Sequence, residues 1–129
     1  MKYSVYDLHC DLLGCVEDND SGYDFDSPEI NCSMPQLEAG DVEFQVFAVA
    51  AVTLPGSTTK AEEQIELFQK LKPRLTKVKG CIACENASVL AEEDEPFEKA
   101  LKRFDAFSKA GRIAYVSLTW NCENRFGGG

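Results

Sequence analysis

Four apolar segments alternate with segments of helical periodicity along the chain, and this alternation limits the folds that the sequence can adopt. The clearest apolar segment is EFQVFAVAAV, 43–52, which is almost continuous and rich in β-branched and aromatic residues. Such a composition is typical of a strand that is buried on both faces of a parallel sheet. We predict further strands over 2–10, 78–87 and 112–121.

Two of the segments between these strands begin with capping patterns. CSMPQLEAGD, 32–41, predicts a short helix, because Ser33 and Gln36 have the spacing of a capping box and Gly40 can end the helix. TTKAEEQIELFQKL, 58–71, predicts a longer helix with a second capping box and an apolar face. Its capping pair is Thr59 and Glu62, and its apolar face consists of Ile65, Phe68 and Leu71.

The segment EPFEKALKRFDAFSKAG, 95–111, has the clearest helical pattern. Its apolar residues fall along one stripe, which predicts a helix that faces the core, and Gly111 marks its end. The stripe consists of Phe97, Ala100, Leu101, Phe104 and Phe107. Strands and helices therefore alternate in the order βαβαβαβ, which predicts an α/β fold with about four parallel strands in a single domain, 1–129.

The charge of the chain limits its partners. Thirteen basic and 22 acidic residues give a formal net charge of −9. Nucleic acids and anionic membranes attract clustered Lys and Arg, so we expect neither as a partner. No apolar stretch has the length of a membrane span, and the N-terminal residues lack the apolar core of a signal peptide. We therefore expect a cytoplasmic protein whose six cysteines are reduced.

Polar residues collect where the predicted strands end. VYDLHCDLL, 5–13, holds the only histidine of the chain, His9, between Asp7 and Asp11. Residues two apart share one face of a strand, so these side chains are predicted to project together, and a divalent cation would offset the cost of burying them. Glu85 ends the third predicted strand and is expected at the same edge of the sheet. The simpler alternative is a strand end at the surface with solvated acids.

Cys81 and Cys84 form a CxxC motif, which raises the alternative of a structural zinc site or a redox pair. A redox CxxC normally lies at a helix N-terminus, where the helix dipole lowers the thiol pKa, whereas this motif lies within an apolar strand. Residues three apart in a strand point to opposite faces. We therefore expect both cysteines to fill the core.

Four blocks of the sequence share the pattern of one enzyme family. The blocks are DLHCD (7–11), CSMPQLEAGDVEFQVFAV (32–49), GCIACENA (80–87) and RIAYVSLTWNCENRFGGG (112–129). They are similar to an Asp-x-His-x-Asp opening, a Pro-x-Leu-x-x-Gly helix leading into a strand, a strand that ends in Glu-Gly-Gly, and a fourth-strand block. In this order, they resemble the membrane (renal) dipeptidase family of zinc peptidases over essentially the whole chain.

The resemblance implies a (β/α)8 barrel hydrolase that holds two zinc ions. His9 and Asp11 would ligate one zinc, and Glu85 would bridge both, because a carboxylate has two oxygens that can each bind a cation. The shared water, once deprotonated, would attack the peptide bond of a dipeptide. Trp120 and Asn121 would contact the substrate.

Three positions depart from the family pattern. Leu8 replaces a small residue before the histidine, and Asn86 and Ala87 replace the two glycines that follow Glu85. Trp120 replaces a histidine that contacts the substrate in the mammalian members, and this change bears on substrate preference.

The second half of the family's metal site has no counterpart in these residues. The remaining family ligands are two histidines from later strands, whereas His9 is the only histidine here. A complete barrel needs about 250 residues. We therefore expect 1–129 to be the N-terminal half of a barrel, without a complete active site of its own. The alternative is a non-catalytic half-barrel that forms a homodimer to cover its open edges, or serves as an interaction module.

Overall fold

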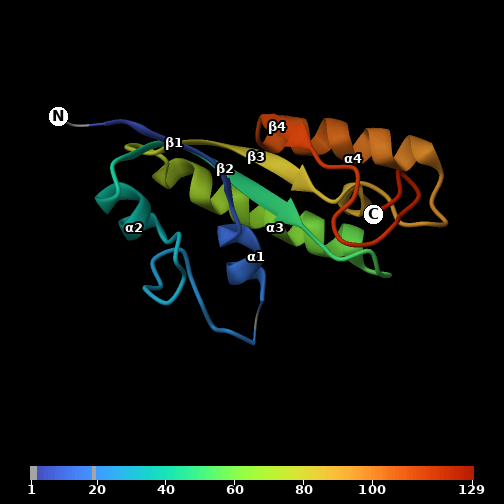
Figure 1. The fold of residues 1–129 in the computed structure, drawn as a ribbon, viewed down its shortest axis with the longest axis horizontal. Coiled ribbons are helices and arrows are strands. Elements are labelled where there is room, and N and C mark those ends of the chain that lie inside the picture. The colour runs from blue at the N-terminus through green and yellow to red at the C-terminus, as the bar shows by residue number, and fades with distance from the viewer. Residues whose placement is uncertain (1–2, 19) are drawn as a thin grey trace.

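The computed structural model describes residues 3–18 and 20–129, and four strands form one parallel sheet (Figure 1). They lie side by side in chain order and are β1 (Val5–Cys10), β2 (Val42–Ala50), β3 (Lys79–Glu85) and β4 (Ile113–Val116). The predicted α/β class with four parallel strands is confirmed. Each strand is shorter than its prediction, and residue 2 of the first prediction lies outside the described residues.

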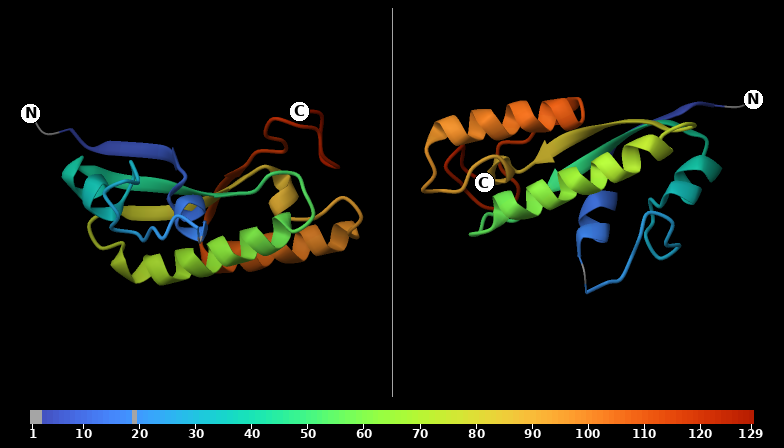
Figure 2. Two further views of the ribbon diagram at one scale, coloured as in Figure 1. Left: turned by 90° about the horizontal axis from the view of Figure 1, so that it is seen from below. Right: turned by 180° about the vertical axis from the view of Figure 1, so that it is seen from behind.

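Helices connect the strands. The α-helices are α1 (Leu12–Glu17), α2 (Met34–Ala39), α3 (Ser57–Leu71) and α4 (Phe97–Ala110), and the short 3₁₀ helices are η1 (Lys72–Arg74) and η2 (Ala87–Val89). Figure 2 shows α3 and α4 along one face of the sheet, and no helix of the described ranges lies on the opposite face. The sequence patterns did not predict α1, which buries Leu12 and Leu13 directly after the first strand.

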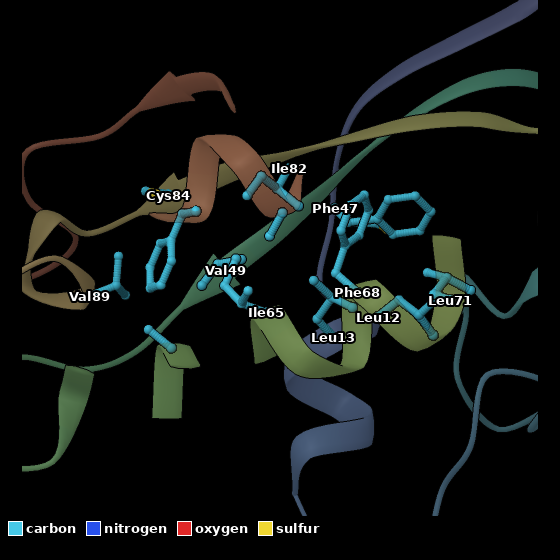
Figure 3. Close-up of a cluster of buried hydrophobic side chains, with 14 of the residues drawn as sticks. Leu12, Leu13, Phe47, Val49, Ile65, Phe68, Leu71, Ile82, Cys84 and Val89 are labelled. Carbon is cyan, nitrogen blue, oxygen red and sulfur yellow. The ribbon is translucent and has the colours of Figure 1, made fainter. Parts of the chain in front are cut away.

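The main core lies between the sheet and the helices (Figure 3). The rings of Phe47 in β2 and Phe68 in α3 pack with their centroids 6.0 Å apart. Ile65, Phe68 and Leu71 are all buried, which confirms the predicted apolar face of α3. A smaller cluster on the other side of the sheet consists of Val46, Cys81 and Ala83.

The predicted start of α2 is confirmed. Ser33 lies directly before the helix, and its backbone N–H donates to the side-chain Oε1 of Gln36 at 3.0 Å. Gly40 follows the last helical residue, as predicted. A local sequence pattern was sufficient here because both partners of the cap lie within one helical turn.

The predicted start of α3 is wrong. The helix begins at Ser57, after Gly56, whose φ of 94° lies in the left-handed region that favours glycine. The Glu92 carboxylate accepts the Gly56 backbone N–H at 2.7 Å and the Thr58 hydroxyl at 3.2 Å. Thr59 therefore lies within the helix. The acceptor at this helix start comes from a distant part of the chain, which a local capping pattern cannot reveal.

The edge strand β1 is irregular. Its pairing with β2 shifts register between Asp7 and Cys10. The Asp7 carboxylate accepts the backbone N–H of His9 at 3.2 Å, and Asp7 is not part of the cluster of possible metal ligands found among the described residues. That Asp7 projects together with His9 and Asp11 therefore stays a prediction.

The apolar stripe of α4 is only partly buried. Ala100 and Phe107 are buried, but Phe97, Leu101 and Phe104 are 53%, 57% and 40% exposed. The prediction that the whole stripe faces the core is therefore wrong. The strand that follows α4 is the last in the sheet, so the outer side of α4 has no neighbouring helix within the described ranges.

An ion-pair cluster holds the loop before α4. The Arg103 guanidinium donates to Glu95 Oε2 at 2.5 Å and to the Leu90 carbonyl at 3.1 Å, and Lys99 Nζ donates to Glu95 Oε1 at 2.9 Å. The hydrogen bonds from Arg103 and Lys99 lower the pKa of Glu95 from 4.5 to about 2. The ionised carboxylate is therefore favoured by folding.

This pKa shift predicts a pH dependence of stability. A folded-state pKa below the unfolded value gives stability that is present above about pH 4.5 and is lost as the pH falls toward 2. Glu95→Gln should therefore be less stable than the wild type near neutral pH, and the difference should shrink to zero over this range. Urea denaturation at several pH values measures this difference in the free energy of unfolding. Glu66→Gln, at an exposed position of α3, is the control. If the stability of Glu95→Gln changed with pH in the same way as that of the wild type, the lowered pKa of Glu95 would be contradicted.

Candidate metal centre

Three polar side chains meet at the carboxyl edge of the sheet. His9 lies near the end of β1, Asp11 is the residue before α1, and Glu85 is the last residue of β3. Their side chains meet because parallel strands end at a common edge. Sequence reasoning singled out all three, and the structure brings them together although Asp11 and Glu85 are far apart in the chain.

The distances between these side chains suit a single cation. His9 Nε2 lies 3.3 Å from Asp11 Oδ1 and 3.5 Å from Glu85 Oε2, and the three ligand atoms are all within 4.8 Å of one another. A tetrahedral zinc with bonds of about 2.0–2.2 Å places its ligand atoms about 3.3–3.6 Å apart. One imidazole and two carboxylates are also donors that zinc accepts. The donor set therefore fits a zinc ion, with room for further ligands, because His9 and Asp11 are exposed and Glu85 is only half-buried.

Tyr115 of β4 contacts the imidazole from the other side. Its hydroxyl lies 2.9 Å from His9 Nδ1 and donates to the Leu8 carbonyl at 3.1 Å. Partial burial and the negative charges of Glu85 and Asp11 raise the pKa of Tyr115, so the phenol keeps its proton. Nothing in the sequence pattern indicated this residue, since 106 positions separate it from His9.

The contact between Tyr115 and β1 shows that the sheet is strongly curved. β4 and β1 are separated by two strands, and in a flat sheet third neighbours lie about 14 Å apart. A tyrosine side chain is far shorter than this, yet the Tyr115 hydroxyl reaches the backbone of Leu8. The face without helices is therefore concave at the carboxyl edge.

An open cleft of about 400 Å³ adjoins the cluster. Its walls include Asp11, Glu85 and the predicted substrate residue Trp120, which is 53% exposed. The other predicted substrate residue, Asn121, is exposed in the same loop and does not line this cleft. The remaining lining residues are Gly14, Glu17, Ala50, Ala51, Val52, Lys60, Gln64 and Asn86.

The sequence matches no protein-family model, and no curated protein matches it.

Lys60 brings a positive charge to the wall of the cleft. Its Nζ donates to both carboxylate oxygens of Glu17, at 2.9 and 3.2 Å. This hydrogen bond raises the pKa of Lys60, so the ammonium form is favoured. Sequence reasoning assigned no role to Lys60, because its place in the cleft wall depends on how α3 packs against α1.

Asn86 fixes the backbone directly after Glu85. The Asn86 residue is only 2% exposed, and its φ of 70° is unusual for a residue other than glycine. Its side-chain partners are the Ala51 carbonyl (2.8 Å), the Thr53 hydroxyl (3.0 Å), the Ser88 backbone N–H (3.3 Å) and the Asn124 side-chain amide (2.8 Å). Asn86 therefore ties together the loops that follow β2, β3 and β4.

The CxxC motif does not form a metal site among the described residues. Cys84 packs in the main core and Cys81 in the small cluster on the other side of the sheet. Burial raises the pKa of both thiols, that of Cys84 to about 12. All six cysteines are free. In the described part of the chain, no helix has the length and apolar character needed to cross a membrane.

Proposed function

We propose that this chain forms the N-terminal half of a zinc-dependent (β/α)8 barrel hydrolase that cleaves dipeptides. The observation that carries the proposal is the cluster of one imidazole and two carboxylates, in which the two distances from His9 Nε2 match the edges of a zinc coordination tetrahedron and all ligand atoms lie within 4.8 Å of one another. Further support comes from the curved sheet, whose four parallel strands follow one another in chain order with α3 and α4 along one face. The resemblance of the four sequence blocks to the dipeptidase family suggests the substrate class.

In this proposal, each residue has a distinct role. His9 Nε2 and one oxygen of Asp11 hold a zinc ion, and Glu85 contributes one oxygen to it and keeps a second oxygen for another cation. A bound zinc lowers the pKa of its water and polarises a carbonyl oxygen. Trp120 forms an apolar wall of the adjoining cleft, and Asn121 in the same loop contacts the substrate from its rim. The family's two further histidines come from outside residues 1–129, so hydrolysis requires a completed barrel.

Metal titration tests the proposal without requiring activity. The metal-stripped chain should bind one Co²⁺ with the visible absorption of a tetrahedral or five-coordinate site, and Zn²⁺ should displace it. Glu85→Gln should weaken Co²⁺ binding at least tenfold, because the neutral amide is a poorer ligand than a carboxylate. Glu63→Gln, at an exposed position of α3, is the matched control and should bind as the wild type does. Co²⁺ binding that is not saturable, or that is equal in Glu85→Gln and the wild type, would refute the proposed metal site.

A specific observation favours a second candidate function, in which the chain is a non-catalytic half-barrel that pairs with a second copy. The sheet face opposite α3 bears no described helix, and α4 exposes the apolar side chains of Phe97, Leu101 and Phe104. Exposed apolar surface of this kind often marks an interface. Sedimentation equilibrium separates the candidates: a dimer that persists in the absence of metal supports pairing, and a monomer at all concentrations counts against it.

A further inference from the structure

The orientation of the His9 ring is set by two hydrogen-bonding contacts of one hydroxyl. Tyr115 Oη lies 2.9 Å from His9 Nδ1 and 3.1 Å from the Leu8 carbonyl oxygen. A carbonyl oxygen can only accept, so the Leu8 contact is satisfied when the single hydroxyl proton of Tyr115 is directed to it. The Tyr115 oxygen is then an acceptor toward His9, and Nδ1 must carry the proton.

The other tautomer makes different contacts. If Nε2 carried the proton, Tyr115 would have to donate to Nδ1, and the Leu8 carbonyl would face an oxygen lone pair at 3.1 Å. The proton on Nε2 would meet Asp11 Oδ1 at 3.3 Å and Glu85 Oε2 at 3.5 Å, so this form is favoured while no cation lies between these atoms. A bound cation takes the place of that proton, and the Nδ1–H form then keeps both contacts of Tyr115.

From this geometry we infer that Tyr115 is a positioning residue, which holds the proton of His9 on Nδ1 so that Nε2 presents a lone pair to a metal ion. The inference rests on the proposed metal site and adds to it the residue that selects the ligating nitrogen. A partner on the second nitrogen of a metal-binding histidine fixes both its tautomer and its ring orientation. Tyr115 acts through His9 and touches neither metal nor substrate.

The test uses the fact that His9 is the only histidine of the chain. In the Zn²⁺-saturated protein labelled with ¹⁵N-histidine, long-range ¹H–¹⁵N spectra report which nitrogen of this one ring carries the proton. We expect the wild type to show the Nδ1–H form. Tyr115→Phe keeps the ring but removes the acceptor, so its spectrum should shift toward the Nε2–H form. Its Co²⁺ affinity should fall about 10- to 100-fold.

Tyr6→Phe is the matched control, because the Tyr6 hydroxyl bonds to Glu43 and does not contact His9. It should leave both the tautomer and Co²⁺ affinity unchanged. An Nε2–H ring in the wild type, or the same tautomer in Tyr115→Phe, would overturn the inference. The two hypotheses fail separately: absence of Co²⁺ binding in the wild type refutes the proposed metal site, whereas a wild type that binds the metal with an Nε2–H ring refutes only the role of Tyr115.

Discussion

Replacing Asn86 with alanine is expected to lower the free energy of unfolding by about 3–5 kcal/mol. The substitution removes four side-chain hydrogen bonds from a buried position, each with a net value of about 1 kcal/mol. It also leaves alanine at a φ of 70°, which alanine tolerates less well than asparagine because it cannot form a local side-chain hydrogen bond. Urea denaturation followed by circular dichroism measures the change.

Two further variants separate these contributions. Asn86→Gly removes the same hydrogen bonds but accepts the positive φ, so it should be more stable than Asn86→Ala by about 1 kcal/mol. Asn121→Ala changes an exposed asparagine of the loop after β4 and should alter stability by less than about 0.5 kcal/mol. If Asn86→Ala lost no more stability than Asn121→Ala, the hydrogen bonds of Asn86 would not contribute to the stability of these loops.

The second large effect is expected in the main core, where Phe68→Ala should lower the free energy of unfolding by about 3–5 kcal/mol. Phe68 is 1% exposed and packs against Phe47. Its ring also occupies the space beside Gly111, where an added Cβ would lie 2.5 Å from a ring carbon. Gly111→Ala should therefore cost about 1–3 kcal/mol by overpacking.

Combining the two substitutions tests this packing directly. In the Phe68→Ala background the ring is absent, so Gly111→Ala should cost clearly less than it does in the wild type, and the two effects should not add. Gly14→Ala is the control, because a Cβ at Gly14 meets no atom within 4 Å. It should be neutral or stabilising by up to about 1 kcal/mol. Additive costs for Phe68→Ala and Gly111→Ala would contradict the predicted contact.

The sheet and the helices α2, α3 and α4 were predictable from the sequence because their signals are local. A continuous apolar run such as 43–52 indicates a buried strand wherever it occurs, and the periodicity of Ile65, Phe68 and Leu71 indicates a helix face. The predicted burial of the α4 stripe was wrong for a different reason. Periodicity shows that Phe97 and Phe107 share a stripe, but only the position of the helix at the end of the sheet decides how much of that stripe is covered.

The candidate metal-binding residues were predictable from the sequence, whereas the residues that hydrogen-bond to them or to the neighbouring loops were not. His9, Asp11 and Glu85 follow from the rule that polar residues at the ends of parallel strands converge. The register shift of β1 between Asp7 and Cys10 could not be predicted, because such a shift in an edge strand leaves no mark in the residue pattern. The roles of Tyr115 and Asn86 could not be predicted, since they depend on hydrogen bonds between segments that are distant in the chain.

The start of α3 has a consequence for the order in which the protein acquires its structure. The Gly56 N–H at this start is bound by Glu92, 36 residues further along, beyond β3 and η2. Local interactions alone therefore do not complete the first turn of this helix, and that turn becomes fully stable only when the third strand and the following loop are in place. We therefore expect the first turn of α3 to fray more readily than the rest of the helix whenever the loop that carries Glu92 detaches.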